Sequence, residues 1–99
     1  MTTPLKLSSQ RGDDGAVVLA AAGEIDMSNA AEFRDALGQA AAGGASFTVD
    51  LTGVDYLDSA GLTVLLPHAP RIKIIATSVL APVLTISGLA GVTSVVPGT

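Results

Sequence analysis

The sequence contains no cysteine, which excludes disulfide bonds, thiolate metal sites and thiol-based redox switching. It contains only five lysine and arginine residues, and these are scattered along the chain. With a formal net charge of −4, the chain lacks the basic stripe that binds nucleic acid, so we expect a protein partner with a basic surface. No leader opens the chain and no long unbroken apolar run occurs, so we expect a cytoplasmic protein without a membrane span.

The 99 residues suit one domain, 1–99, and the order of apolar patterns predicts its class. Alternating or continuous short apolar segments are typical of strands, and five are present: 4–9, 16–22, 47–51, 71–76 and 92–96. Helical spacing occurs in three segments: 30–40, 59–66 and 80–86. The order strand, strand, helix, strand, helix, strand, helix, strand predicts an α/β domain with a mixed, mostly parallel sheet of about five strands.

Turn and breaker residues mark the boundaries of these elements. Residues 11–15 form a turn by composition, which would join the first two strands as a hairpin. Gly43 and Gly44 are expected to end the first helix, and Gly88 the third. Pro67 and Pro70 are expected to stop the second helix within two or three turns.

The junction between the third strand and the second helix contains the most informative polar residues. Asp58 is a natural N-cap, because its carboxylate can accept hydrogen bonds from the amides of the first helical turn. This places the Ser59 hydroxyl at a helix N-terminus, exposed and beside several free amides. Ser59 is then either a small polar residue of the first turn or an acceptor of phosphate. A phosphate adds about −1.5 to −2 charges beside Asp58, enough to repel a partner docked over the same spot.

Acidic residues follow two of the predicted strands and could meet at one edge of the sheet. Four carboxylates are of this kind: Glu24, Asp26, Asp55 and Asp58. Their oxygens would suit Mg²⁺, although capping and turn formation are the more common use of such residues. Asn29 with Glu32 fits a capping box for the first helix, and Ser28 is an equally plausible cap.

Nucleophilic hydrolysis finds little support in the sequence. It requires a serine, a base and an orienting acid within reach of one another. The only histidine is His68, between Pro67 and Ala69, and it is expected to lie in a loop. The segment around Ser59 also lacks the glycine that precedes the serine by two positions in a nucleophile elbow.

Five segments that occur in order carry a resemblance to a known family. They are Gly23-Glu24-Ile25-Asp26, Ala31-Glu32-Phe33-Arg34-Asp35-Ala36-Leu37, Val49-Asp50-Leu51-Thr52-Gly53-Val54, Leu57-Asp58-Ser59-Ala60-Gly61-Leu62 and Ser87-Gly88-Leu89. Together they resemble the STAS domain of anti-sigma factor antagonists over nearly the whole chain. The resemblance implies a five-stranded mixed sheet with helices packed against it.

The resemblance also implies a non-enzymatic binding module that switches partners and holds no cofactor. Ser59 matches the serine that is phosphorylated in such proteins. The enzyme that phosphorylates it is the anti-sigma factor, which is itself a serine kinase using ATP and magnesium. The unphosphorylated antagonist binds the anti-sigma factor and releases the sigma factor, and a serine phosphatase restores binding after phosphorylation. The partner-binding residues by this resemblance are Asp26, Asp58, Ser59, Ala60, Gly61 and Leu62.

The sequence departs from the family pattern in three places, and two other functions remain open. Ala60 replaces a second hydroxyl residue, the region 66–72 is shorter than usual, and Pro82 falls where the third helix would continue. The main alternative is a stand-alone STAS subunit that binds the ATPase of an ABC transporter for lipids or solutes. A third is a small sensor that binds a nucleotide or a metal at the acidic edge.

Overall fold

The structure is a computed structural model that describes residues 4–12, 15–42, 46–86, 88 and 94–98. Five strands form one sheet in the order of the chain: β1 (Lys6–Arg11), β2 (Val17–Ile25), β3 (Phe47–Leu57), β4 (Ile72–Ala76) and β5 (Ser94–Pro97). Only β1 is antiparallel to its neighbour, and β2 to β5 pair in parallel. The predicted mixed, mostly parallel five-stranded sheet is therefore confirmed.

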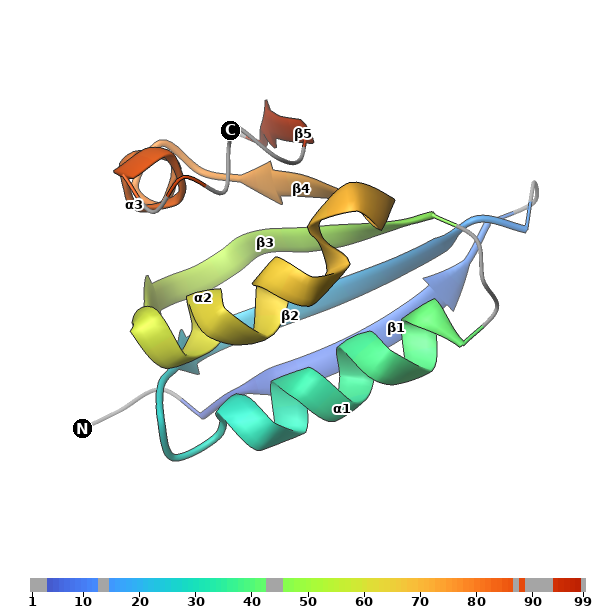
Figure 1. Cartoon of the computed structure of the whole chain (residues 1–99), viewed down its shortest axis with the longest axis horizontal. Helices are drawn as coiled ribbons and strands as arrows, with labels where there is room; N and C mark the ends of the chain where they lie inside the picture. The colour runs from blue at the N-terminus through green and yellow to red at the C-terminus, as the bar shows by residue number, and fades with distance from the viewer. Residues whose placement is uncertain (1–3, 13–14, 43–45, 87, 89–93, 99) are drawn as a thin grey trace.

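Three α-helices connect the parallel strands: α1 (Ala30–Ala41), α2 (Ser59–Leu65) and α3 (Ala81–Ile86), with a 3₁₀ helix, η1 (Leu66–Arg71), directly after α2. Parallel strands that follow one another with right-handed crossovers keep their helices on one face of the sheet. Figure 1 shows α1 and α2 on the same face, in front of the strands. None of the helices in the described ranges is long and apolar enough to cross a membrane.

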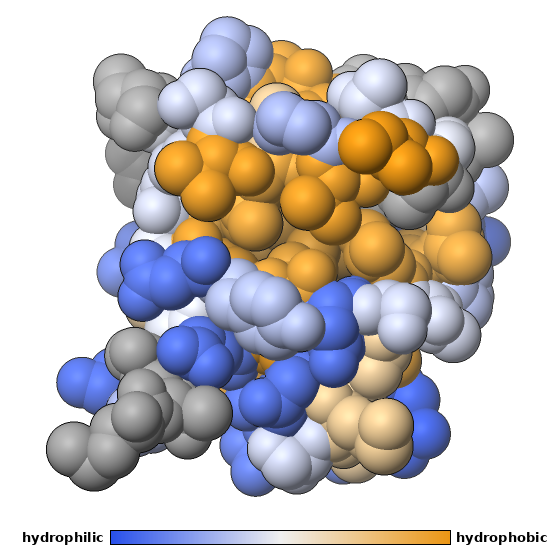
Figure 2. All heavy atoms as spheres, turned by 90° about the vertical axis from the view of Figure 1, so that its left-hand side faces the viewer, coloured by the Kyte–Doolittle hydropathy of each residue, from blue (hydrophilic) through white to orange (hydrophobic). Residues whose placement is uncertain are grey.

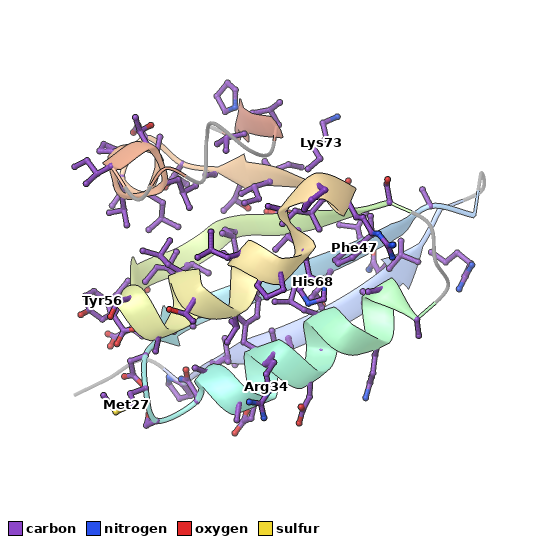
Figure 3. All side chains as sticks on the ribbon, in the orientation of Figure 1. Met27, Arg34, Phe47, Tyr56, His68 and Lys73 are labelled. Atoms are coloured by element: carbon purple, nitrogen blue, oxygen red, sulfur yellow. The ribbon has the colours of Figure 1, made fainter. Side chains whose placement is uncertain are left out.

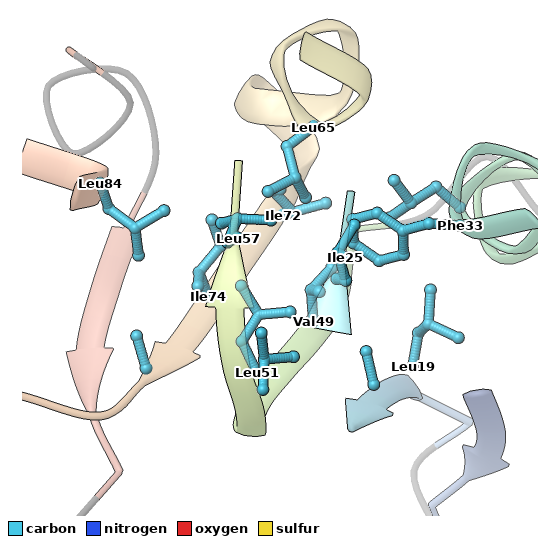
Figure 4. Packing of buried hydrophobic residues seen from close by; sticks show 14 of the residues in the cluster. Leu19, Ile25, Phe33, Val49, Leu51, Leu57, Leu65, Ile72, Ile74 and Leu84 are labelled. Atoms are coloured by element: carbon cyan, nitrogen blue, oxygen red, sulfur yellow. The ribbon is translucent and has the colours of Figure 1, made fainter. Parts of the chain in front are cut away.

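The hydrophobic core lies between this helical layer and the sheet. Phe33, Leu65 and Leu84 project from α1, α2 and α3, and each is fully buried. They meet the inward-facing side chains of the strands, including Val49 and Ile74 (Figure 4). The opposite face of β3 carries polar residues, which explains the alternation in the sequence.

Strand β3 is longer than the sequence predicts, because the alternation of buried and exposed residues ends before the strand does. The pairing of β2 with β3 shifts register between Ala20 and Ala22 and again between Gly23 and Glu24. After Leu51 the buried residues of β3 are therefore three apart, at Val54 and Leu57. The strand continues to Leu57 although its period-two pattern ends at Leu51.

The helix boundaries also differ from the prediction in two places. Helix α2 ends at Leu65, just before Pro67, as predicted. His68 nevertheless does not lie in a loop, because the chain continues into the 3₁₀ helix η1. Helix α3 begins at Ala81, so Pro82 falls in its first turn, where a missing backbone N–H is tolerated. The glycines expected to end α1, at 43 and 44, lie outside the described residues.

Candidate functional site

The β3–α2 junction has the predicted cap. Asp58 is extended, with φ −97° and ψ −175°, and its Oδ1 accepts hydrogen bonds from the amides of Ala60 at 2.9 Å and Gly61 at 3.2 Å. The Asp58 amide donates to the carbonyl oxygen of Ile25 at 3.2 Å, which ties the junction to the end of β2. Ser59 is the first residue of α2, and its side chain is exposed.

The amides around Ser59 are less free than the sequence predicts. Asp58 occupies those of Ala60 and Gly61, and the Leu62 amide donates to the Asp58 carbonyl oxygen at 3.1 Å. A group added to the Ser59 hydroxyl would therefore lie beside the Asp58 carboxylate, which already occupies the amides of Ala60 and Gly61. A negative charge on Ser59 would thus add to the charge of Asp58 at this exposed junction.

The residues that follow Ser59 fix the position of α2. Gly61 is buried, and a Cβ atom built on it would overlap Leu57 Cδ1 and lie 2.8 Å from Ile25 Cγ2. Gly61 thus lets the helix approach the ends of β2 and β3 and is not itself on the surface. Ala60 and Leu62 are half-buried, so they are partly available to a partner.

The turn between β2 and α1 is held by side chains that bond within it. Asp26 Oδ1 accepts from the Ser28 amide at 2.9 Å and from the Ser28 hydroxyl at 2.5 Å. These bonds from the Ser28 hydroxyl, and secondarily from its amide, lower the pKa of Asp26 below its ordinary value of 3.8. Asp26 is accordingly a carboxylate at neutral pH.

The predicted capping box of α1 is wrong. Asn29 is the N-cap but makes no side-chain cap bond. Its Oδ1 accepts instead from the Asp26 amide at 2.9 Å, and its Nδ2 donates to the Glu24 carbonyl oxygen at 2.9 Å. Asn29 therefore closes the turn at the end of β2, and neither Ser28 nor Glu32 completes a cap.

The two turns lie at the same edge of the sheet. Ile25 pairs with Leu57 and Glu24 pairs with Tyr56 across parallel strands, so Asp26 and Asp58 follow neighbouring strand ends. Within the described ranges, however, no three acidic or histidine side chains approach closely enough to hold a metal ion. The described acidic residues at this edge, Asp26 and Asp58 among them, place negative charge at the strand ends next to the Ser59 junction.

His68 lies away from this edge. It is half-buried in η1, and its ring packs edge-on against Phe47, with the ring centroids 6.1 Å apart. Phe47 begins β3 whereas Ser59 follows the end of that strand, and Figure 3 shows His68 beside Phe47 and distant from Tyr56. Ser59 and His68 thus do not form a nucleophile–base pair.

Exposed apolar side chains at the same end of the molecule were not predicted as site residues. Tyr56 is 51% exposed, Met27 83%, Val79 70% and Ile86 86%. Figure 2, which faces this end, shows apolar side chains gathered in its upper half and hydrophilic ones below. We call Met27, Tyr56, Val79 and Ile86 the apolar edge residues. The apolar run 79–86 is a sequence signal for Val79 and Ile86, because a segment with so short a helix cannot bury all its apolar side chains.

Comparisons with known proteins place the chain in a family. The model of the family described as Mlab, STAS domain, matches residues 8–94. The chain therefore belongs to the STAS domain family. A comparison with curated proteins returns no match.

Solved structures share the fold. An anti-sigma factor antagonist from Mycobacterium paratuberculosis has a TM-score of 0.88 and 23% identity, over 99% of this chain and 92% of that chain. The anti-sigma factor antagonist SpoIIAA in its unphosphorylated form has a TM-score of 0.74 and 18% identity, over 95% and 89%. A Shewanella loihica protein of the DUF3478 family with a SpoIIAA-like fold has a TM-score of 0.67 and 15% identity, over 99% and 88%.

Proposed function

We propose that this protein is an anti-sigma factor antagonist, a cytoplasmic and non-enzymatic binding module whose partner is an anti-sigma factor with serine kinase activity. The observation that carries the proposal is the exposed Ser59 hydroxyl at the start of α2, directly after the capping Asp58. The same Asp-Ser sequence carries the resemblance to antagonists, and two structural neighbours are described as anti-sigma factor antagonists.

Phosphorylation of Ser59 would switch the binding off for an electrostatic reason. The phosphate brings the formal net charge from −4 to about −6. It adds this charge beside Asp58, whose carboxylate already occupies the nearest amides. A partner docked over Ser59 then meets concentrated negative charge, which costs several kcal/mol where it meets like charge or a desolvated surface. A serine phosphatase that removes the phosphate would restore binding.

The apolar edge residues support a partner-binding surface around Ser59. Val79 and Ile86 are highly exposed, and a partner that covers them removes apolar surface from water, which favours binding. The acidic edge with Asp26 and Asp58 would favour a partner with lysine or arginine around an apolar centre. Asp26, Asp58, Ser59, Ala60 and Leu62 would contact this partner, and Gly61 would hold the helix in place.

The proposal is tested with Ser59 variants and the cognate anti-sigma factor, identified by capture from the native cells. Calorimetry should show that Ser59→Ala binds as the wild-type protein does, whereas Ser59→Asp and Ser59→Glu lose about 100-fold or more in affinity. Ser8→Asp is the matched control, because Ser8 is an exposed serine of β1 on the far side of β2 from the junction. Equal binding by all Ser59 variants would refute the switch.

The identity of the captured protein separates the proposal from its alternative. Capture of a small kinase-like ATPase that also binds a sigma factor supports the antagonist function. Capture of the ATPase of an ABC transporter, with no effect of Ser59→Asp, would assign the chain instead as a transporter subunit. Val79→Ser and Ile86→Ser should weaken binding in either case, because both residues are exposed and their loss leaves the fold intact.

A further inference from the structure

A hollow of about 460 Å³ lies between the edge strand β1 and helix α1, which run side by side in Figure 1. The register of the hairpin places alternate residues of β1 on the helix-facing side, since Ser9 pairs with the buried Leu19 and Arg11 pairs with Val17. We call this space the β1–α1 hollow. Its lining includes Ser9, Arg11, Leu19, Ala36, Ala40 and Phe47.

The hollow exists because the side chains that face each other across it are short. Helix α1 fills the central core with Phe33 and Leu37, which are fully buried. Toward β1 it presents Ala36 and Ala40, which are only half-buried, and the strand offers Ser9. The hollow is open to solvent along the exposed Ser9, Arg11 and Gln39. Its volume falls in the range of small-molecule sites.

The chemistry of the lining specifies a ligand with one apolar part and one anionic group. The inner wall is apolar, from Leu7, Val17, Leu19 and Phe47 together with the two alanines. Among the lining residues that the structure describes, Arg11 is the only charged one, in a protein that is acidic overall. Its Nη1 donates to the Gly15 carbonyl oxygen at 3.3 Å, which holds the guanidinium at the hairpin end of the hollow.

The guanidinium has the donors that a carboxylate needs. It carries five N–H groups in a planar fork, and the bond to Gly15 uses one of them. Across the described ranges, no carboxylate forms an ion pair with Arg11. An arginine fork binds a carboxylate through two parallel hydrogen bonds, which are among the stronger hydrogen bonds in proteins.

We propose that the β1–α1 hollow binds a medium-chain carboxylic acid, with its alkyl chain along Leu19, Ala36 and Ala40 and its carboxylate on Arg11. This site is separate from the Ser59 surface. Arg11 pairs with Val17 at the start of β2, and Phe47 is the first residue of β3. Ser59 follows the opposite, carboxyl end of β3. The inference therefore goes beyond the partner-switching function and does not depend on it.

The test is titration of the full chain with decanoate below its micelle concentration, followed by calorimetry and by ¹H–¹⁵N NMR. We expect one site, with the amide shifts concentrated on Ser9, Leu19, Ala36 and Ala40. Arg11→Ala should weaken decanoate binding by about tenfold or more, since a hydrogen bond to a charged group is lost. Decanol, which has the same chain without the charge, should bind to the wild-type protein about as weakly as decanoate binds to this variant.

Two further variants make the test specific. Arg34→Ala is the matched control, because Arg34 is an exposed arginine of α1 that does not line the hollow, and it should leave the affinity unchanged. Ala36→Leu should fill the hollow and abolish binding, and Ala40→Leu serves the same purpose if the first variant does not fold. The proposal is overturned if decanoate does not bind, if Arg11→Ala and Arg34→Ala weaken it equally, or if the shifts fall elsewhere.

Discussion

Replacing Gly61 by alanine tests the packing that positions Ser59. The added methyl group would overlap Leu57 Cδ1 and approach Ile25 Cγ2 to 2.8 Å, and both of these residues are buried. Insertion of a methyl group into a filled core costs about 1–3 kcal/mol. Alanine recovers at most about 1 kcal/mol through its higher helix propensity. Because the methyl group meets two buried side chains at once, its cost falls in the upper part of that range, at about 2–3 kcal/mol, and we expect a net loss of about 1–2 kcal/mol.

Gly38→Ala is the matched control within the same chain. Gly38 lies in α1 and is exposed, and a Cβ atom built on it meets no heavy atom within 4 Å. Only the helix-propensity effect remains there, so this variant should gain about 0.5–1 kcal/mol. The two substitutions are chemically identical and are predicted to change stability in opposite directions.

Urea denaturation and thermal unfolding, followed by circular dichroism, measure both variants. A loss of 1–2 kcal/mol corresponds to a Tm lower by about 5–15 °C for a domain of this size. Because α2 must move to relieve the overlap, the Gly61→Ala protein should also show altered amide shifts at Ser59. A Gly61→Ala protein as stable as the wild type would refute the close approach of α2 to the ends of β2 and β3.

Two further predictions concern the turns on either side of the site. Asp58→Ala removes the cap of α2 and should cost about 0.5–2 kcal/mol of unfolding free energy in urea, and an unchanged midpoint would contradict the cap. Ser28→Ala should raise the pKa of Asp26 toward 3.8, followed by carbon NMR of the carboxyl group, since the hydroxyl bond is the main cause of the lowered value. Because the folded-state pKa is lowered, the contribution of Asp26 to stability is present above about pH 4 and is lost as the pH falls through the folded-state pKa. The wild-type protein should therefore lose this contribution at a lower pH than the Ser28→Ala variant.

The fold could be predicted where the burial pattern is regular. The alternation of Phe47, Val49 and Leu51 marks the start of β3, because every second residue faces the helices. The end of β3 could not be predicted, since the register shifts place Val54 and Leu57 three residues apart. A pattern read along one strand does not contain the pairing of its neighbour, on which such a bulge depends.

The site was predictable to the extent that its bonds are local. The Asp58 cap depends on amides two and three residues away, and the sequence indicates it correctly. The role of Asn29 depends on the carbonyl of Glu24 at the end of β2, so the capping-box pattern was misleading. The exposure of Val79 and Ile86 depends on how the turn before α3 and the last residue of α3 lie against the sheet, which hydrophobicity alone does not specify.

The most direct test of the central claim is peptide mass spectrometry of the protein isolated from its native cells with phosphatases inhibited, combined with analysis of what co-purifies. We expect phosphate on Ser59, and a kinase-like partner that accompanies only the molecules without it. A chain that carries no phosphate on Ser59 in any growth condition, or a phosphorylated chain that retains the same partner, would contradict the account.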